Sequence, residues 1–203
     1  GTPVTGSIAV ASASQQIVNI DVSGLGDGTL TVSLTLTDAA GNVSSPAVTN
    51  TISKDAAVPT VDVVAVSDGH YGLGSTIDIT VTLTEDVTVS GTLSTLSIDI
   101  DGVARQAVFV SAASGVLTYR YTVQAGDNTG ASGLIVDANG IVLNGDTMRD
   151  AGSNDADLSY SQWNSVNVIV DTTAPVDPVV TTPAGAISTN QATTLISGTH
   201  AED

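Results

Sequence analysis

The strongest constraint on this chain is an alternation of apolar and polar residues with a period of two. In GTLTVSLTLTD, residues 28–38, every second residue from Leu30 to Leu36 is apolar, and the residues between them are Thr or Ser. The same alternation recurs at 75–86, 96–102, 116–124 and 167–171. Since alternate residues of a strand face the same side, each run predicts a strand with one buried face. Helical periodicity is nearly absent, so the chain is predicted to be all-β.

Short segments rich in Gly, Asp and Asn separate these runs, among them GDG, DAAGN, SDGHYGLG, AGDN and NGD. These residue types favour tight turns because they tolerate unusual backbone angles or bond their own backbone. Many short strands joined by frequent turns are typical of a β-sandwich.

Two stretches carry the same Asp-x-x-x-Pro pattern, Asp55 with Pro59 and Asp171 with Pro175. Each follows a strand run and precedes a Val-rich start, and proline stiffens an extended linker while ending a sheet. They predict domain joints, with one complete domain at 58–173 between segments 1–57 and 174–203.

A second pattern precedes each joint, TDAAGN at 37–42 and RDAGSN at 149–154, so both regions close alike and form a divergent internal repeat. Segment 1–57 has the turn pattern that ends a domain but no domain start. Segment 174–203 has the Val-rich start that follows a joint but no such ending. Each is too short to bury its own apolar face. We therefore expect one domain split between the chain ends. One reading is that the ends continue into neighbouring copies of a periodic array, so that low-numbered residues of an adjacent copy cover the apolar face of Leu195. The other is that the ends pair with each other or between chains.

The segments VDTTAPVDPVVTTP, TTLISGTHAED and DGTLTVSLTLTDAAGNVSSPAVTNTISKD resemble the opening and closing parts of bacterial Ig-like repeats. The middle segment, with DGHYGLGSTIDITVTLTEDVTVSG and IVLNGDTMRDAGSN, resembles a longer Ig-like or cadherin-like repeat of the same proteins. These are giant secreted adhesins of the repeats-in-toxin or biofilm-associated type. The resemblance covers nearly the whole chain and departs at GTHAED and RDAGSND. It implies tandem Ig-like β-sandwich domains in an extender module, exported from a Gram-negative cell to its surface, with calcium at the domain joints.

The acidic composition limits which kinds of partner the chain can bind. Asp and Glu number 21 against 4 Lys and Arg, a formal net charge of −17, which argues against nucleic acid and anionic membrane. Such a chain attracts divalent cations. No apolar run could span a bilayer, and no signal peptide is visible, so an export signal is expected elsewhere in a longer chain, if export occurs. Without Cys, the chain is either intracellular or an extracellular protein stabilised by metal, and the Asp content favours the second.

Calcium binds six to eight oxygens from carboxylates, carbonyls and water. The candidate ligands lie at the joints, on the repeated turns, beside a Gly-rich loop and at a strand end. They are Asp38, Asn42, Asp55, Asp68, Glu85, Asp86, Asp150, Asn154 and Asp171. The same residues could instead serve only as turn formers, and the chain has neither an EF-hand loop nor a nonapeptide calcium repeat.

Catalysis is not expected. His70 and His200, read as loop residues, are the only histidines, and without Cys they make no zinc site. Adjacent Glu85 and Asp86 should point to opposite faces of a strand, unlike a glycosidase pair. Trp163 and Tyr160 are interpreted as a cap on the core or a contact at a domain junction, rather than a ligand groove.

The sequence therefore predicts a non-enzymatic extender repeat of an extracellular adhesin or surface filament, rigidified by calcium. Its expected partners are neighbouring repeats or copies of itself, with a host or cell-surface ligand bound through other domains. Three alternatives stay open: a filament subunit completed by strand exchange between chains, a glycan- or peptide-binding adhesin module, and an accessory domain of an enzyme.

Overall fold

The structure, a computed structural model, describes all residues except 1–2, 12–14, 16–19, 46–47, 183–196 and 200–203. The described residues form fifteen strands and no helix, and hence no helix long and apolar enough to cross a membrane. The strands are β1 (Gly28–Leu34), β2 (Val48–Lys54), β3 (Val61–Val66), β4 (Gly69–Tyr71), β5 (Thr76–Leu83), β6 (Thr88–Val89), β7 (Thr95–Ile100), β8 (Val103–Ala113), β9 (Val116–Thr122), β10 (Leu134–Val142), β11 (Met148–Arg149), β12 (Trp163–Ser165), β13 (Val168–Val170), β14 (Val179–Thr182) and β15 (Ser197–Thr199).

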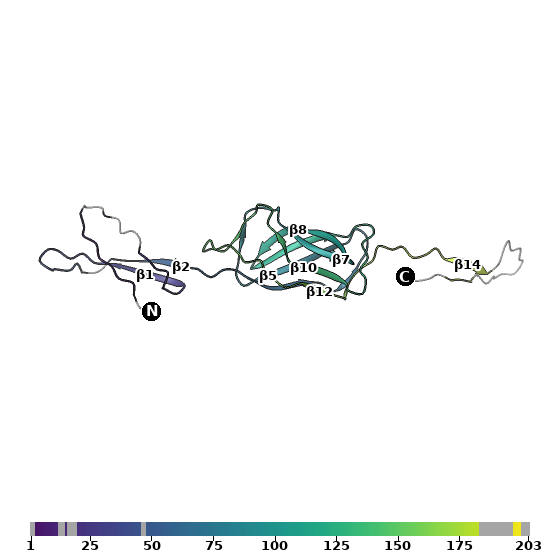
Figure 1. Cartoon of the computed structure of the whole chain (residues 1–203), viewed down its shortest axis with the longest axis horizontal. Helices are drawn as coiled ribbons and strands as arrows, with labels where there is room; N and C mark the ends of the chain where they lie inside the picture. Colours follow the sequence, from purple (N-terminus) through teal and green to yellow (C-terminus); the bar gives the residue numbers. More distant parts are fainter. Residues whose placement is uncertain (1–2, 12–14, 16–19, 46–47, 183–196, 200–203) are drawn as a thin grey trace, which may run out of the picture.

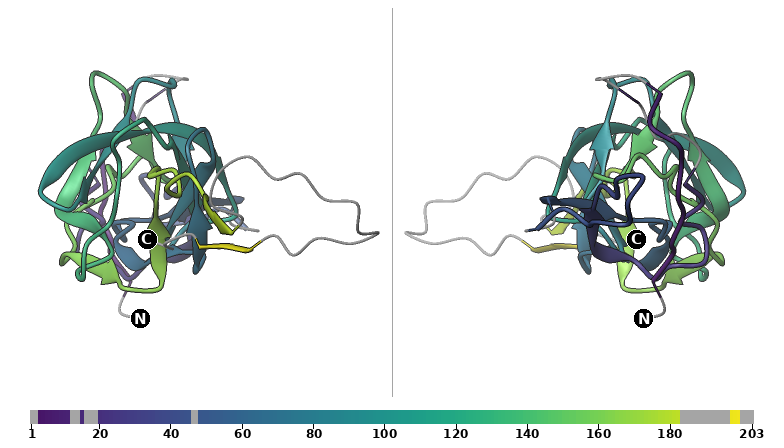
Figure 2. Two further views of the ribbon diagram at one scale, coloured as in Figure 1. Left: turned by 90° about the vertical axis from the view of Figure 1, so that its right-hand side faces the viewer. Right: turned by 90° about the vertical axis from the view of Figure 1, so that its left-hand side faces the viewer.

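The centre of the molecule is a seven-stranded sheet in the order β12-β10-β7-β8-β9-β5-β3, with every neighbouring pair antiparallel. Two small ladders accompany it, the parallel pair β4–β13 and the antiparallel pair β6–β11. Seen along the long axis of Figure 1, these strands curve around a common centre (Figure 2). The prediction of an all-β chain is confirmed, and the large antiparallel sheet is consistent with a β-sandwich.

The core of this sheet follows the predicted alternation. On β5, Ile77, Ile79 and Val81 are fully buried, while Asp78 between them faces outward and pairs with Arg120 across on β9. The buried residues of β7, β9 and β10 join the same cluster, and so do Met148 of β11 and the two buried valines of β13. The small ladders therefore pack over the buried face of the sheet.

Four aromatic residues lie in or against the core. Tyr119 and Tyr121 are buried on one face of β9. Trp163 and Tyr160 are partly buried against the core, as expected of a cap. The interpretation of His70 as a loop residue is wrong, because it lies on β4 opposite Ile169 of β13. His200 lies outside the described residues.

The first segment forms β1 within the predicted run 28–38 and pairs it with β2, but the apolar face of this pair is largely exposed. Strands β1 and β2 pair antiparallel over their whole length. Val32, Leu34 and Ile52 are 50%, 45% and 61% exposed. The predicted inward face is thus largely exposed among the described residues, because a two-stranded sheet by itself has no second sheet to pack against.

The two predicted joints lie between strands. The chain passes from β2 to β3 through residues 55–60, and from β13 to β14 through residues 171–178. Beyond the second joint, β14 and β15 pair antiparallel as a hairpin that extends away from the central sheet (Figure 1). Leu195, for which a covering partner was expected, lies outside the described residues. The domain boundaries at 57/58 and 173/174 stay predictions.

Candidate metal centre

Three carboxylates from distant parts of the chain meet at the first joint. Asp55 follows β2, Glu85 follows β5 and Asp150 follows β11. One oxygen from each lies within 4.8 Å of the others, and Asp150 is buried. This acidic triad could hold a metal ion.

A repeated turn holds Asp150 in the triad. Its Oδ1 accepts from the backbone N–H of Asn154 at 2.8 Å, and its Oδ2 accepts from the Asn154 amide at 2.9 Å. The same amide lies 3.3 Å from the backbone oxygen of Asp55. Gly152 allows this approach, because a Cβ there would lie 2.9 Å from the Cβ of Asp55. The turn at 149–154 therefore contacts the first segment at Asp55, through Asn154 and Gly152.

The surroundings of the triad shift the pKa values of Glu85 and Asp150 in opposite directions. Burial raises the pKa of the Glu85 carboxyl, and the negative charges of Asp55 and Asp150 raise it further. Burial acts the same way on Asp150, but the hydrogen bonds from Asn154 outweigh it and hold the pKa of Asp150 below its ordinary value. Glu85 therefore carries the repulsion within the triad, which a bound cation would remove.

Sequence reasoning missed one nearby acid, Asp27. It adds to the negative potential at Glu85. Its Oδ1 lies 3.0 Å from the Lys54 ammonium and accepts from the backbone N–H of Ala56 at 3.1 Å. The only available signal was its place in the turn GDG, which by itself says nothing about what the turn faces.

The other predicted ligands lie apart from the triad. Asp38 and Asn42 bond each other on the first repeated turn. Asp68 accepts from Ser165 and Asn167. Asp86 lies next to Gly115 and contributes no oxygen to the triad. Asp171 accepts from the backbone N–H of Thr173 at the second joint. Of the nine candidates, the structure brings together Asp55, Glu85, Asp150 and Asn154.

At the second joint, amide and hydroxyl groups make the contacts. Asn128 Oδ1 accepts from the backbone N–H of Thr172 at 2.7 Å, and the hydroxyl of Thr129 bonds Val170. Among the described residues, the triad at the first joint is the one group of three or more metal-binding side chains.

The chemistry of the triad is that of a hard cation site. Its donors are carboxylate oxygens, with neither His nor Cys, which suits calcium or magnesium better than zinc. Three carboxylates supply part of a six- to eight-oxygen shell, and backbone carbonyls and water commonly supply the rest. No family model, curated protein or solved structure matches this chain.

Proposed function

We propose that this chain is a structural extender repeat of an extracellular bacterial adhesin or surface filament, built of tandem Ig-like sandwich units and rigidified by calcium at the first joint. The observation that carries the proposal is the span of the triad. Asp55 follows β2 of the first segment, whereas Glu85 follows β5 of the central sheet and Asp150 follows β11 of the small ladder packed on it. A cation bound by all three would fix one part to the other.

The mechanism is thermodynamic rather than catalytic. Without a cation, the three carboxylates repel one another, and this repulsion adds to burial in raising the pKa of Glu85. Calcium neutralises the cluster and binds only the arrangement in which the three acids are close. By linkage, it stabilises that arrangement against hinge motion and unfolding. Extracellular modules commonly bind calcium at about 10⁻⁴–10⁻³ M, so millimolar calcium suffices.

The net charge of −17 supports the same role. Charges of one sign keep a long chain soluble and discourage contacts with nucleic acid and anionic lipid. The partners that fit are neighbouring repeats or copies of this chain, with any host ligand bound by other domains. No chemical step is assigned to the triad, since its acids are explained as cation ligands.

The proposal is tested by measuring hinge freedom and stability together. Because the chain has no Cys, Ser33→Cys and Thr122→Cys can carry a dye pair that reports the distance between the first segment and the central sheet. Adding 10 mM calcium to chelated protein should narrow the distance distribution. It should also raise the melting temperature of the central sheet by about 10 °C, if the ion is about a hundredfold above its Kd.

A matched pair of variants locates the effect. Glu85→Gln removes one triad charge, and Asp86→Asn removes a charge from the adjacent residue outside the triad. Only the first should abolish the response to calcium. Identical melts and distance distributions with calcium and with chelator would refute the proposal, and an equal loss in both variants would show that net charge, not the triad, is responsible.

A further inference from the structure

The second joint is held by a loop of the central sheet. Residues 124–130 come after β9, and they bond the chain where it leaves β13 at Val170. Thr129 N donates to Val170 O at 2.8 Å, and Val170 N donates to the Thr129 hydroxyl at 2.9 Å. The loop therefore holds both backbone groups of the last residue of β13.

One asparagine of this loop holds the residues just beyond β13. Asn128 Oδ1 accepts from the backbone N–H of Thr172 at 2.7 Å, and the hydroxyls of Thr172 and Thr173 lie 3.4 and 3.3 Å from the same oxygen. Gly126 N donates to the Thr172 hydroxyl at 3.1 Å. Asp171 Oδ1 accepts from Thr173 N at 2.8 Å, so this carboxylate bonds the chain's own backbone. These bonds together fix the direction in which the chain leaves the central sheet.

The loop itself is anchored by a buried charge next to Asn128. The Asp127 side chain is fully buried, and its Oδ1 lies 2.7 Å from a guanidinium nitrogen of Arg105 on β8. Its Oδ2 accepts from the hydroxyl of Tyr121 on β9 and from the backbone N–H of Gln124. Breaking a buried ion pair is costly, so two strands of the central sheet keep the loop in place.

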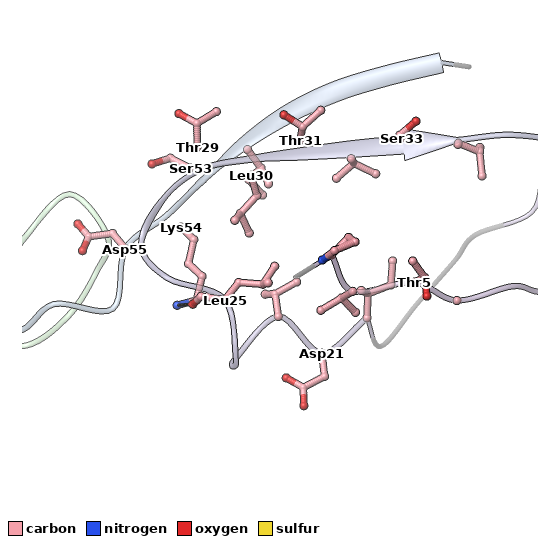
Figure 3. Close-up of a pocket in the computed structure, with 18 of the residues that line it drawn as sticks. Thr5, Asp21, Leu25, Thr29, Leu30, Thr31, Ser33, Ser53, Lys54 and Asp55 are labelled. Carbon is pink, nitrogen blue, oxygen red and sulfur yellow. Dashed lines mark hydrogen bonds between the residues drawn. The ribbon is translucent and has the colours of Figure 1, made fainter. Parts of the chain in front are cut away.

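The first joint is built differently, from charged groups. Figure 3 shows the Lys54 side chain reaching toward Leu25, whose backbone oxygen accepts from it at 2.8 Å, whereas the Asp55 carboxylate points away from Leu25. Among the described residues, the one hydrogen bond between this segment and the central part runs from the Asn154 amide to Asp55 O, at 3.3 Å. The acidic triad lies at the same place, and its like charges repel one another. The two joints therefore differ in what fixes them when no cation is bound.

We infer that the second joint is a fixed joint held by Asn128, and that its direction needs no calcium. The groups that cross this joint are amide, hydroxyl and backbone groups, whose hydrogen bonds form without a cation. Pro175 and Pro178 lengthen the stiff stretch, because proline fixes its own φ angle. This inference goes beyond the proposed function, which concerns the first joint. The two together mean that removing calcium frees one of the two joints and leaves the other fixed.

A dye pair on the whole chain tests the second joint separately from the first. Gln106→Cys on β8 and Asp177→Cys beyond the joint replace exposed residues and report the distance across it. In chelator this distance distribution should be narrow, and 10 mM calcium should leave it unchanged. Asn128→Leu keeps a side chain of similar size but removes the accepting oxygen. It should broaden the distribution and speed amide hydrogen exchange at Thr172 by about tenfold.

Asn167→Leu is the matched control, because Asn167 is an exposed asparagine before β13 that bonds Asp68 rather than the joint. It should change neither measurement. A second joint that is broad in chelator and narrows with calcium overturns the inference. So does an Asn128→Leu chain with the distance distribution and the Thr172 exchange rate of wild type. A first joint that ignores calcium, beside a second joint that is narrow in chelator, would refute the proposed function while supporting this inference.

Discussion

Asp127 is the residue whose loss should most weaken the central sheet and the second joint together. Its side chain is fully buried and its Oδ1 lies 2.7 Å from an Arg105 guanidinium nitrogen. Its Oδ2 accepts from the hydroxyl of Tyr121 and from the backbone N–H of Gln124. The next residue, Asn128, holds the chain at Thr172 as it leaves the sheet. Asp127→Ala therefore removes the anchor of the loop that positions the second joint.

The expected cost follows from what is left behind. Removing one partner of a buried ion pair costs about 3–5 kcal/mol, mainly because the remaining charge loses its compensation. Arg105 is 24% exposed on its side chain and can turn partly to water, which places the cost near the lower limit, about 3 kcal/mol. With a urea slope of about 2 kcal/mol per molar, the unfolding midpoint should fall by about 1.5 M.

Urea unfolding followed by the single tryptophan, Trp163, measures this change. Asp78→Ala is the matched control, since Asp78 also pairs with an arginine across the sheet but is 43% exposed on its side chain. Its loss should cost less than about 1 kcal/mol, as for other surface pairs. Equal midpoints for the two variants would refute the reasoning that burial sets the value of the Asp127 pair.

Two further changes test the core. Gly133→Ala should lower the free energy of unfolding by about 3 kcal/mol or more, because Gly133 has φ +68° and a Cβ there would lie 1.9 Å from Ser165 O. Gly145→Ala is the control. Gly145 has φ +100° and open space around it, so this change should lower the free energy of unfolding by only about 1–2 kcal/mol in the same urea assay. Burial raises the pKa of Tyr119 to about 12, against an opposing hydrogen bond from Ser94. The neutral phenol is thus favoured in the fold, so its stabilisation is complete below pH 10 and is lost as pH rises from 10 to 12. The loss is up to about 3 kcal/mol. Tyr119→Phe should make this part of the profile less steep in melts between pH 9 and 12. A slope remains because burial also raises the pKa of Tyr121 to about 12. An unchanged profile would contradict the assignment.

The acids of the candidate site could be identified from the sequence, but their meeting at one place could not. Every member of the triad was visible as an acid at a strand end or a turn, together with five candidates that lie elsewhere. Asp55, Glu85 and Asp150 are far apart in sequence, and only the packing of β2, β5 and β11 decides which oxygens meet. Asp127 escaped notice for the same reason, since the turn AGDN looks like any exposed turn until the chain folds over it.

Local alternation by itself determined that these runs form strands and which residues of each strand share a face. Those properties depend on neighbours two residues apart and on turn residues, and they hold equally for β5 and β1. The tertiary structure alone decided that Ile79 is buried while Ile52 is exposed. Burial of a face requires a second layer, and the layer that covers β5 comes from strands dozens of residues away. Residues 3–8 and 20–25 line the same hollow as β1 but leave Ile52 exposed.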